Sequence, residues 1–209
     1  MKYSRLAVFP ATVSVILLAN CSTEKQPSEQ PPGTSSASTA LSIRQTDDNG
    51  VALPFETDFP ERWNSSNDGT PYEPCTAISQ VDAESAGLDP TSVADAAAVS
   101  GQTLRGCRWI FVGSGATGWS ADQVVADFES LDEYKKDNSD FDWFDDVSVD
   151  GRTVGVASAT GRNCFTYVQS KSSGVTTGVM FIGTDRPPLT EICQRAIDLT
   201  KATIDKIPE

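Results

Sequence analysis

The 209 residues carry 29 acidic and 16 basic side chains and no histidine, which gives a formal net charge of −13 at pH 7. A surface so rich in negative charge repels nucleic acids and anionic lipid head groups, so we expect no nucleic-acid partner. Without histidine the chain lacks the usual base of Ser-His and Cys-His nucleophilic systems, and we predict no catalytic residue of that kind.

The N-terminus has the pattern of a bacterial export signal. Lys2 and Arg5 precede an apolar run over residues 6–18, which is too short to span a bilayer. The run ends in Leu-Ala-Asn-Cys, which looks like a lipobox. Residues 1–20 are therefore predicted to be a signal peptide, and Cys21 is predicted to carry the lipid that anchors the chain to the extracytoplasmic face of the cell membrane. The alternative is an ordinary secretory signal with an accidental cysteine.

A low-complexity segment follows the signal. Residues 22–49 are rich in Pro, Ser, Thr, Gln and Glu, and such a composition cannot bury enough apolar surface to fold. Over residues 51–63, Leu, Phe and Trp side chains are spaced among prolines and acids, as in an extended strap laid on a domain. We therefore place a disordered tether and strap at residues 21–70 and a single folded domain at residues 71–209, which is long enough for one core.

The first half of this domain is predicted to mix helices with one strand. A short helix begins at Pro74, a second is capped by Ser79 and stopped by Gly87, and a strand covers residues 105–112. Ser120 with Gln123 resembles a capping box, and the apolar residues that follow recur at helical spacing, which predicts an amphipathic helix. Its apolar positions are Val124, Phe128, Leu131 and Tyr134.

The second half has the alternating pattern of strands. Asp150-Gly151 lies between two alternating segments and is a strong hairpin signal. Further strands are predicted at residues 164–169 and 175–183, and Pro187-Pro188 begins a final helix with an apolar face. The order of elements predicts an α+β fold, in which helices pack on an antiparallel meander sheet of about five strands.

Four cysteines remain after Cys21, and an even number in an exported chain indicates two disulfides. Four cysteines allow three pairings. We favour the sequential one, Cys75 with Cys107 and Cys164 with Cys193. A metal site is the competing use, but the chain has neither a CxxC spacing nor a histidine, so no metal is predicted.

The stretch GSGATGWS, at residues 113–120, has the GxGxxG spacing of a dinucleotide-binding loop. That fold needs a second buried parallel strand after the helix, and residues 135–142 are too polar to form one. Trp119 also occupies a position that requires a small residue. We therefore interpret the stretch as a flexible connecting loop and predict no cofactor.

Three aromatic residues, Phe141, Trp143 and Phe144, lie within a run of aspartates at residues 137–150. The run lacks the glycine and glutamate of an EF-hand in register, so a weak calcium site is the less favoured interpretation. A second interpretation is a solvated loop whose aromatic side chains point into the core. The third interpretation, which we keep as a candidate site, is an interaction surface formed by the three aromatics.

The order of these motifs resembles a known family. Cys21, the tether, Pro74-Cys75 before Ala86-Gly87, Cys107-x-Trp109 and the late cysteine pair together are similar to actinobacterial lipoproteins of unknown function, which include mycobacterial Lpr-type lipoproteins. The resemblance implies an exported, disulfide-bonded, membrane-anchored domain of the cell envelope. It supplies no established catalytic residues.

Two classes of function are consistent with these observations. The first is a non-catalytic binding or interaction domain for an unknown envelope protein or small ligand, and a structural role cannot be separated from it by sequence. The alternative is a carboxylate-dependent hydrolase of cell-wall glycan, which requires two acids about 5 to 9 Å apart. The sequence does not reveal such a pair, and we expect that the protein is not an enzyme.

Overall fold

A computed structural model describes residues 42–115 and 118–209. The predicted signal peptide and Cys21 lie outside the described residues. Residues 42–70, which fall in the predicted tether and strap, belong to the same compact unit as residues 71–209. None of the helices within the described ranges is both long and apolar enough to cross a membrane.

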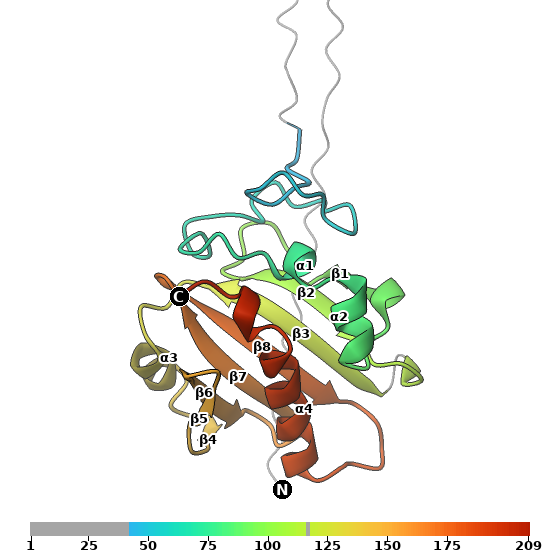
Figure 1. Cartoon of the computed structure of the whole chain (residues 1–209), viewed down its shortest axis with the longest axis vertical. Helices are drawn as coiled ribbons and strands as arrows, with labels where there is room; N and C mark the ends of the chain where they lie inside the picture. Colours follow the sequence, from blue (N-terminus) through green and yellow to red (C-terminus); the bar gives the residue numbers. More distant parts are fainter. Residues whose placement is uncertain (1–41, 116–117) are drawn as a thin grey trace, which may run out of the picture. The chain divides into compact units, whose positions relative to one another are not determined.

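The centre of the fold is an antiparallel sheet in which the strands follow the order β1-β2-β3-β8-β7-β6-β4, with β5 paired to β6 (Figure 1). The predicted α+β class is confirmed, although the sheet has eight strands rather than about five. The strands are β1 (Ala94–Asp95), β2 (Arg105–Ile110), β3 (Trp119–Ala126), β4 (Asp142–Trp143), β5 (Val147–Val149), β6 (Arg152–Ser158), β7 (Asn163–Ser170) and β8 (Ser173–Phe181).

The meander β5-β6-β7-β8 forms as the alternating pattern predicted. Asp150 and Gly151 both have positive φ, 49° and 81°, as the central residues of a two-residue type I′ hairpin require. The sheet continues beyond β8, the last strand of the meander, because β3 pairs with β8 along the whole length of β3. The sheet therefore joins the two halves of the chain through a pairing between residues far apart in sequence.

The helix predicted from Ser120 is wrong, because residues 119–126 form β3 and pair with both β2 and β8. Along this strand Ala121, Gln123 and Val125 are buried and the residues between them are not, so the period of two overrides the helical spacing. Gln123 is fully buried, and its amide donates to the hydroxyl oxygens of Thr177 and Thr203 at 2.9 and 3.0 Å.

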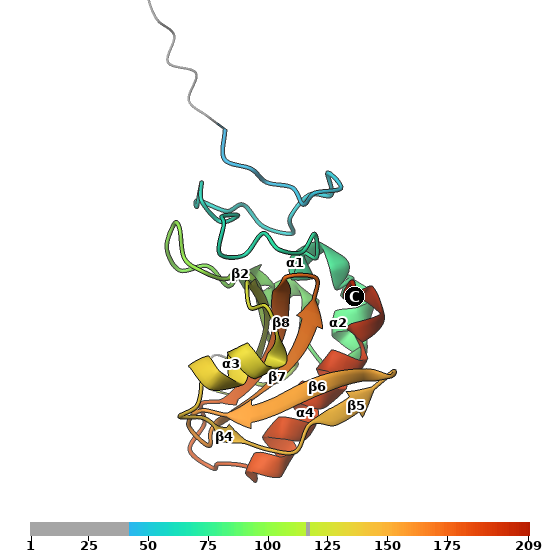
Figure 2. The same ribbon diagram turned by 90° about the vertical axis from the view of Figure 1, so that its left-hand side faces the viewer.

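Helices lie on both faces of the sheet. The helix α4 (Leu189–Lys201) packs on β7 and β8 through Ile192, Ala196 and Leu199, as its apolar face predicted. On the other face, α3 (Leu131–Asp137) covers only part of the sheet (Figure 2). The remaining helical segments are α1 (Pro74–Ala77), α2 (Gln80–Ser85) and the 3-10 turns η1 (Pro90–Ser92) and η3 (Ile204–Lys206).

Two disulfides join helices to strands, and both follow the predicted sequential pairing. Cys75 in α1 is bonded to Cys107 in β2, and Cys164 in β7 is bonded to Cys193 in α4. Each bond fixes a helical segment to the face of the sheet that carries the core. Disulfides of this kind persist in oxidising compartments and indicate an extracytoplasmic location.

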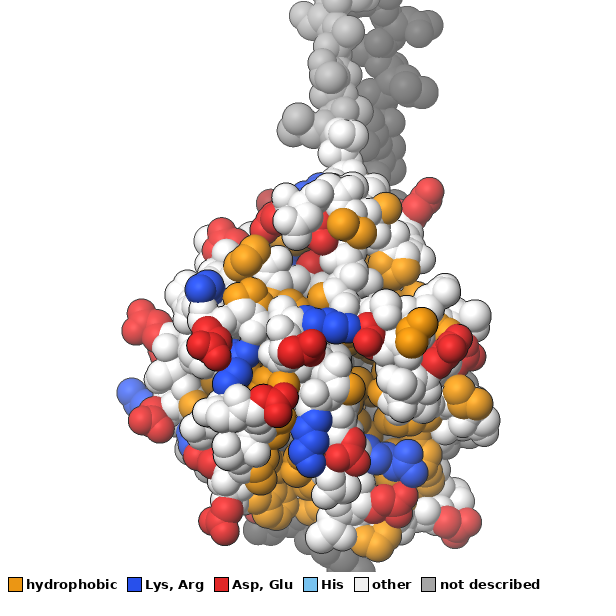
Figure 3. Space-filling view, in the orientation of Figure 1, with side chains coloured by type: hydrophobic (Ala, Val, Ile, Leu, Met, Phe, Trp, Pro, Cys, Tyr) orange, Lys and Arg blue, Asp and Glu red, His pale blue; other side chains and the backbone are white. Residues whose placement is uncertain are grey.

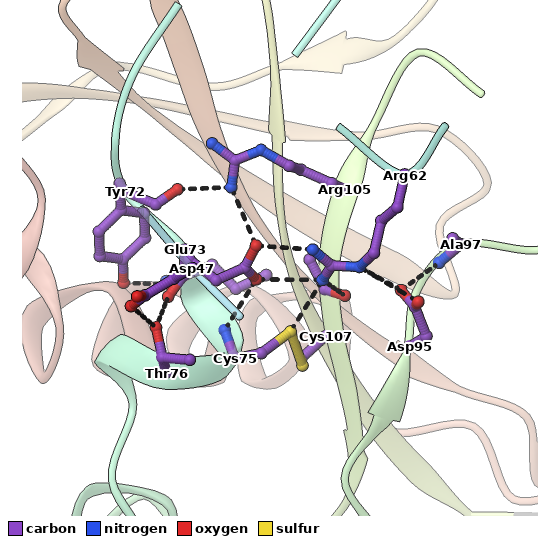
Figure 4. The surroundings of a disulfide bond; sticks show 12 residues. Asp47, Arg62, Tyr72, Glu73, Cys75, Thr76, Asp95, Ala97, Arg105 and Cys107 are labelled. Carbon is purple, nitrogen blue, oxygen red and sulfur yellow. Dashed lines mark hydrogen bonds and ion pairs between the residues drawn. A yellow bond between two sulfur atoms is a disulfide. The ribbon is translucent and has the colours of Figure 1, made fainter. Parts of the chain in front are cut away.

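A buried ion cluster fixes the segment that precedes α1 (Figure 4). The guanidinium of Arg62 is fully buried and donates to Glu73 at 2.7 Å and to Asp95 at 3.1 Å, and Arg105 donates to Glu73 at 3.1 Å. Burial acts to lower the pKa of Arg62, but the hydrogen bonds and charge of Glu73 raise it overall. Arg62 also donates to Cys75 Sγ at 3.2 Å, so the cluster contacts the first disulfide. This part of the predicted strap belongs to the core.

Candidate ligand-binding groove

The face of the sheet turned away from α4 carries the largest cavities. Two of them, of about 630 and 730 Å³, lie side by side and share Leu104, Asp122 and Val124 in their linings. We call the combined depression the groove. Each of the two cavities has a volume in the range of small-molecule sites, roughly 300 to 1,000 Å³.

The groove exists because α3 stops short of β2, β3 and the second half of β8. Alternate residues of these strands therefore face it without a covering helix, among them Ser120, Asp122 and Val124 on β3 and Thr176 and Met180 on β8. The connection before β2 contributes Thr103 and Leu104 to the same lining.

Aromatic side chains form the end of the groove next to α3. Phe141 stacks on Phe165 of β7 with ring centroids 5.8 Å apart, and Tyr134 of α3 stacks on Tyr167 at 4.6 Å. Phe141, Phe165 and Tyr134 all line the 630 Å³ cavity. This end therefore offers flat apolar surfaces together with one phenol hydroxyl.

Asp122 lies at the middle of the groove, where the two cavities meet. It is in register with Gly178 on β8, and a Cβ on Gly178 would come within 2.8 Å of both carboxylate oxygens. The carboxylate therefore lies over a strand position that only glycine leaves open. Burial raises the pKa of the Asp122 carboxylate to about 6. Within residues 42–115 and 118–209, no hydrogen bond or ion pair to this carboxylate offsets the effect of burial.

Two other ionisable side chains face Asp122. Arg108 on β2 is its cross-strand partner and lines the same cavity, yet its exposed guanidinium forms no ion pair with Asp122 in the described part of the chain. On α3, burial raises the pKa of Tyr134, and the charge of Asp122 adds to this rise while a hydrogen bond to Thr176 opposes it. Asp122 is thus an anion without a partner among these residues.

A second carboxylate, Asp127, lines the groove but is already engaged. It accepts hydrogen bonds from the Gly69 amide at 3.0 Å and from the Ser173 hydroxyl. Asp127 lies five positions after Asp122, just beyond the end of β3. Glycosidases use a pair of carboxylates that flank the scissile bond, and Asp127 is instead occupied by these two hydrogen bonds.

The structure does not gather the three aromatics at residues 141–144 into one surface. Phe141 faces the groove, whereas Trp143 is half-buried against Tyr134 and donates its Nε1 hydrogen to the Asn138 carbonyl at 2.9 Å. Phe144, 43% exposed, lines a separate apolar hollow of about 300 Å³ beside α4. Figure 3 shows hydrophobic side chains in the surface beside this helix.

The two weaker motifs of the sequence have structural roles. The glycine-rich stretch begins after β2, and its last two residues, Trp119 and Ser120, already belong to β3, the antiparallel neighbour of β2. It therefore leads into a strand and not into the helix of a dinucleotide fold. In the aspartate run, Asp146 forms an ion pair with Lys135 at 2.7 Å. Within the described ranges no group of three or more Asp, Glu, Cys or His side chains has the arrangement of a metal site.

Sequence reasoning missed Asp122. A strand pattern at residues 119–126 would have placed it on the less buried face, but the capping-box interpretation of Ser120 and Gln123 hid that pattern. Its position beside Gly178 has no local signal, because the two residues are 56 positions apart.

Comparison with known proteins identifies a family. A family model described as "Protein of unknown function (DUF3558)" matches residues 16–206. Neither the curated proteins nor the solved structures contain a match to the chain.

Proposed function

Because the chain belongs to the DUF3558 family of proteins of unknown function, we propose a function from its own site: it is an exported, lipid-anchored protein that binds a small ligand without catalysis. The ligand occupies the groove on the open face of the sheet. The single observation that carries this proposal is the half-buried carboxylate of Asp122, which has no hydrogen-bond or ion-pair partner among the described residues and lies in a depression whose surface is mostly apolar.

The shape of the site favours a small molecule over a protein partner. The groove is concave, each of its two cavities has the volume of a small-molecule site, and most of the surface that lines them is apolar. The disulfides already indicate an extracytoplasmic location. A ligand of the cell envelope would therefore be the one available to the protein.

The lipid anchor is tested at Cys21. Replacing Cys21 with alanine removes the thiol to which the lipid is attached, so the protein is expected to move from the membrane fraction to the soluble fraction. Fractionation of cells fed a radioactive fatty acid measures both location and label. Ser22→Ala is the neighbouring control and is expected to remain labelled and membrane-bound. Membrane retention of Cys21→Ala would contradict the anchor.

Ligand binding is tested by filling the groove. Thr176 lines the groove from β8, and Thr176→Trp would occupy much of the space beside Asp122. Native mass spectrometry of the protein purified from its own envelope is expected to reveal a bound small molecule in the wild type and to lose it in Thr176→Trp.

Thr190→Trp is the matched control, because Thr190 lines the hollow beside α4 on the other face of the sheet. It is expected to retain the molecule. Equal loss in both variants would contradict binding in the groove.

The alternative function, hydrolysis of cell-wall glycan, is tested by incubating the wild type with that glycan. Release of reducing ends that depends on Asp122 would favour a hydrolase.

A further inference from the structure

The arrangement of apolar and charged side chains in the groove favours one class of ligand. Its floor and ends are largely apolar, through Ile110, Val124, Met180 and Phe165, while a single anion lies at its centre. We propose that the ligand is a small amphiphile whose ammonium group pairs with the Asp122 carboxylate and whose apolar body lies along the groove. This inference rests on the proposed function and deepens it.

The first step of the argument is the missing counter-charge. A carboxylate taken partly out of water loses hydration, and an ion pair or hydrogen bonds normally compensate this loss. In the described part of the chain Asp122 has neither, although Thr176 and Tyr134 are close to it. The site is therefore complementary to a ligand that brings a positively charged hydrogen-bond donor.

The second step excludes a metal ion as the cation. Calcium and magnesium require six or more oxygen ligands, several of them from the protein. Asp127, the other carboxylate in the lining, lies beyond the end of β3 and already accepts two hydrogen bonds, from the Gly69 amide and the Ser173 hydroxyl. One carboxylate suits an ammonium group, which needs only a few acceptors and can use the Thr176 hydroxyl and the Tyr134 phenol oxygen as well.

The third step concerns Gly178. A side chain at this position would collide with both carboxylate oxygens of Asp122, so glycine allows the carboxylate to lie against β8 and face the open groove. The neighbouring strands pair on both sides of Asp122, which holds the backbone of the site rigid. The carboxylate is thus preorganised for a ligand before the ligand arrives.

The positive charge of Arg108 allows the charge of the bound ligand group to be tested. Its guanidinium lines the same cavity and is exposed, so it repels a cation bound at Asp122. Arg108→Gln is expected to strengthen the binding of a simple amine. A ligand held mainly by an anionic group at Arg108 would respond in the opposite direction.

The experiment compares three probes with the same tail: decylamine, decanol and decanoate, titrated at pH 7.5 below their micellar concentrations. Calorimetry is expected to give affinities in the order amine, alcohol, carboxylate, with decylamine about tenfold tighter than decanol. In Asp122→Asn this preference is expected to disappear while decanol still binds.

Asp127→Asn is the matched control, because it removes one negative charge from the same groove. General attraction of amines to an acidic protein changes equally in both variants, so Asp127→Asn is expected to keep the preference for decylamine. Asp122→Asn is expected to fold, because it removes a carboxylate whose ionised form burial disfavours. Its thermal midpoint at pH 7.5 is therefore expected to be at least that of the wild type.

The preference for the amine is also expected to weaken as the pH falls. Burial raises the pKa of Asp122 to about 6, and a bound ammonium group favours its ionised form, so the loss occurs below pH 6. The amine itself stays protonated in this range. The charged or titratable groups that face Asp122 are Arg108 on β2 and Tyr134 on α3, and burial raises the pKa of Tyr134 above its usual value near 10. Gly178 and Thr176 on β8 carry no titratable side chain.

The outcomes separate this inference from the proposed function. If decanol binds as tightly as decylamine, or if Asp122→Asn leaves the preference intact, the ammonium class is wrong although the groove still binds a ligand. If neither decylamine nor decanol binds, and native mass spectrometry gives the same result for Thr176→Trp as for the wild type, both proposals are wrong. A carbon-13 titration that places the Asp122 pKa below 4 would mean that Arg108 neutralises it, and this would also overturn the inference.

Discussion

Replacing Glu73 with glutamine is expected to lower the free energy of unfolding by about 3 to 5 kcal/mol, the cost of breaking a buried ion pair by removing one partner. The Glu73 carboxylate accepts hydrogen bonds from Arg62 at 2.7 and 3.1 Å, from Arg105 at 3.1 Å and from the Cys75 amide at 3.2 Å. Glutamine has nearly the same shape. It removes the charge that two buried guanidinium groups share, and leaves Asp95 as their remaining anion in the cluster.

Urea unfolding followed by tryptophan fluorescence, with the disulfides intact, measures this loss. The matched control is Glu191→Gln in α4, whose carboxylate forms an exposed pair with Arg195. Exposed pairs of this kind contribute about 0.5 kcal/mol or less, so the control is expected to unfold almost as the wild type does. Equal small losses in both variants would mean that the Arg62 cluster does not stabilise the fold.

Removing the Cys75–Cys107 disulfide by a double substitution to alanine is expected to cost more than removing Cys164–Cys193. The two bonds join residues 32 and 29 positions apart, so their effect on the entropy of the unfolded chain is nearly the same, about 3 to 4 kcal/mol. Only the first bond also contacts the buried cluster, because Arg62 donates to Cys75 Sγ at 3.2 Å. Loss of this bond therefore increases the entropy of the unfolded chain and also disturbs the packing around the buried Arg62 guanidinium.

The two double variants serve as controls for each other under the same urea titration. Chemical reduction of the wild type is expected to give at least the larger of the two losses. If the variants lose the same stability, the disulfide and the ion cluster contribute independently, and the coupling inferred from their contact is absent.

The sequence predicted best those elements that carry a local signal. Asp150-Gly151 adopts the positive φ angles of a type I′ turn, and the apolar face of α4 meets the sheet as its spacing indicated. The use of four cysteines in two disulfides was also accessible, because exported chains use even numbers of cysteines for disulfides. In each case the information lies within a few residues or follows from the residue type.

The features that were missed depend on contacts between distant residues. β3 is a strand because β2 and β8 pair with it on both sides, and that pairing outweighs the capping signal at Ser120. Arg62 carries no local signal of burial, because its partners Glu73 and Asp95 come from other parts of the chain. Asp122 belongs to this group, since the groove is made only when the sheet is complete.

The attachment of residues 44–73 to the fold also decides how mechanical force would enter the molecule. Tension applied at the N-terminal side of Arg62 acts first on its contacts with Glu73 and Asp95, and then on the covalent bond from Cys75 to Cys107. That bond passes the load to β2, near one edge of the sheet, and not to the central strands β3 and β8 that form the floor of the groove. A pull on this end of the chain would thus displace the leading segment, with Ser65 and Ser66 at the rim of the groove, before the load reaches the strands that form its floor.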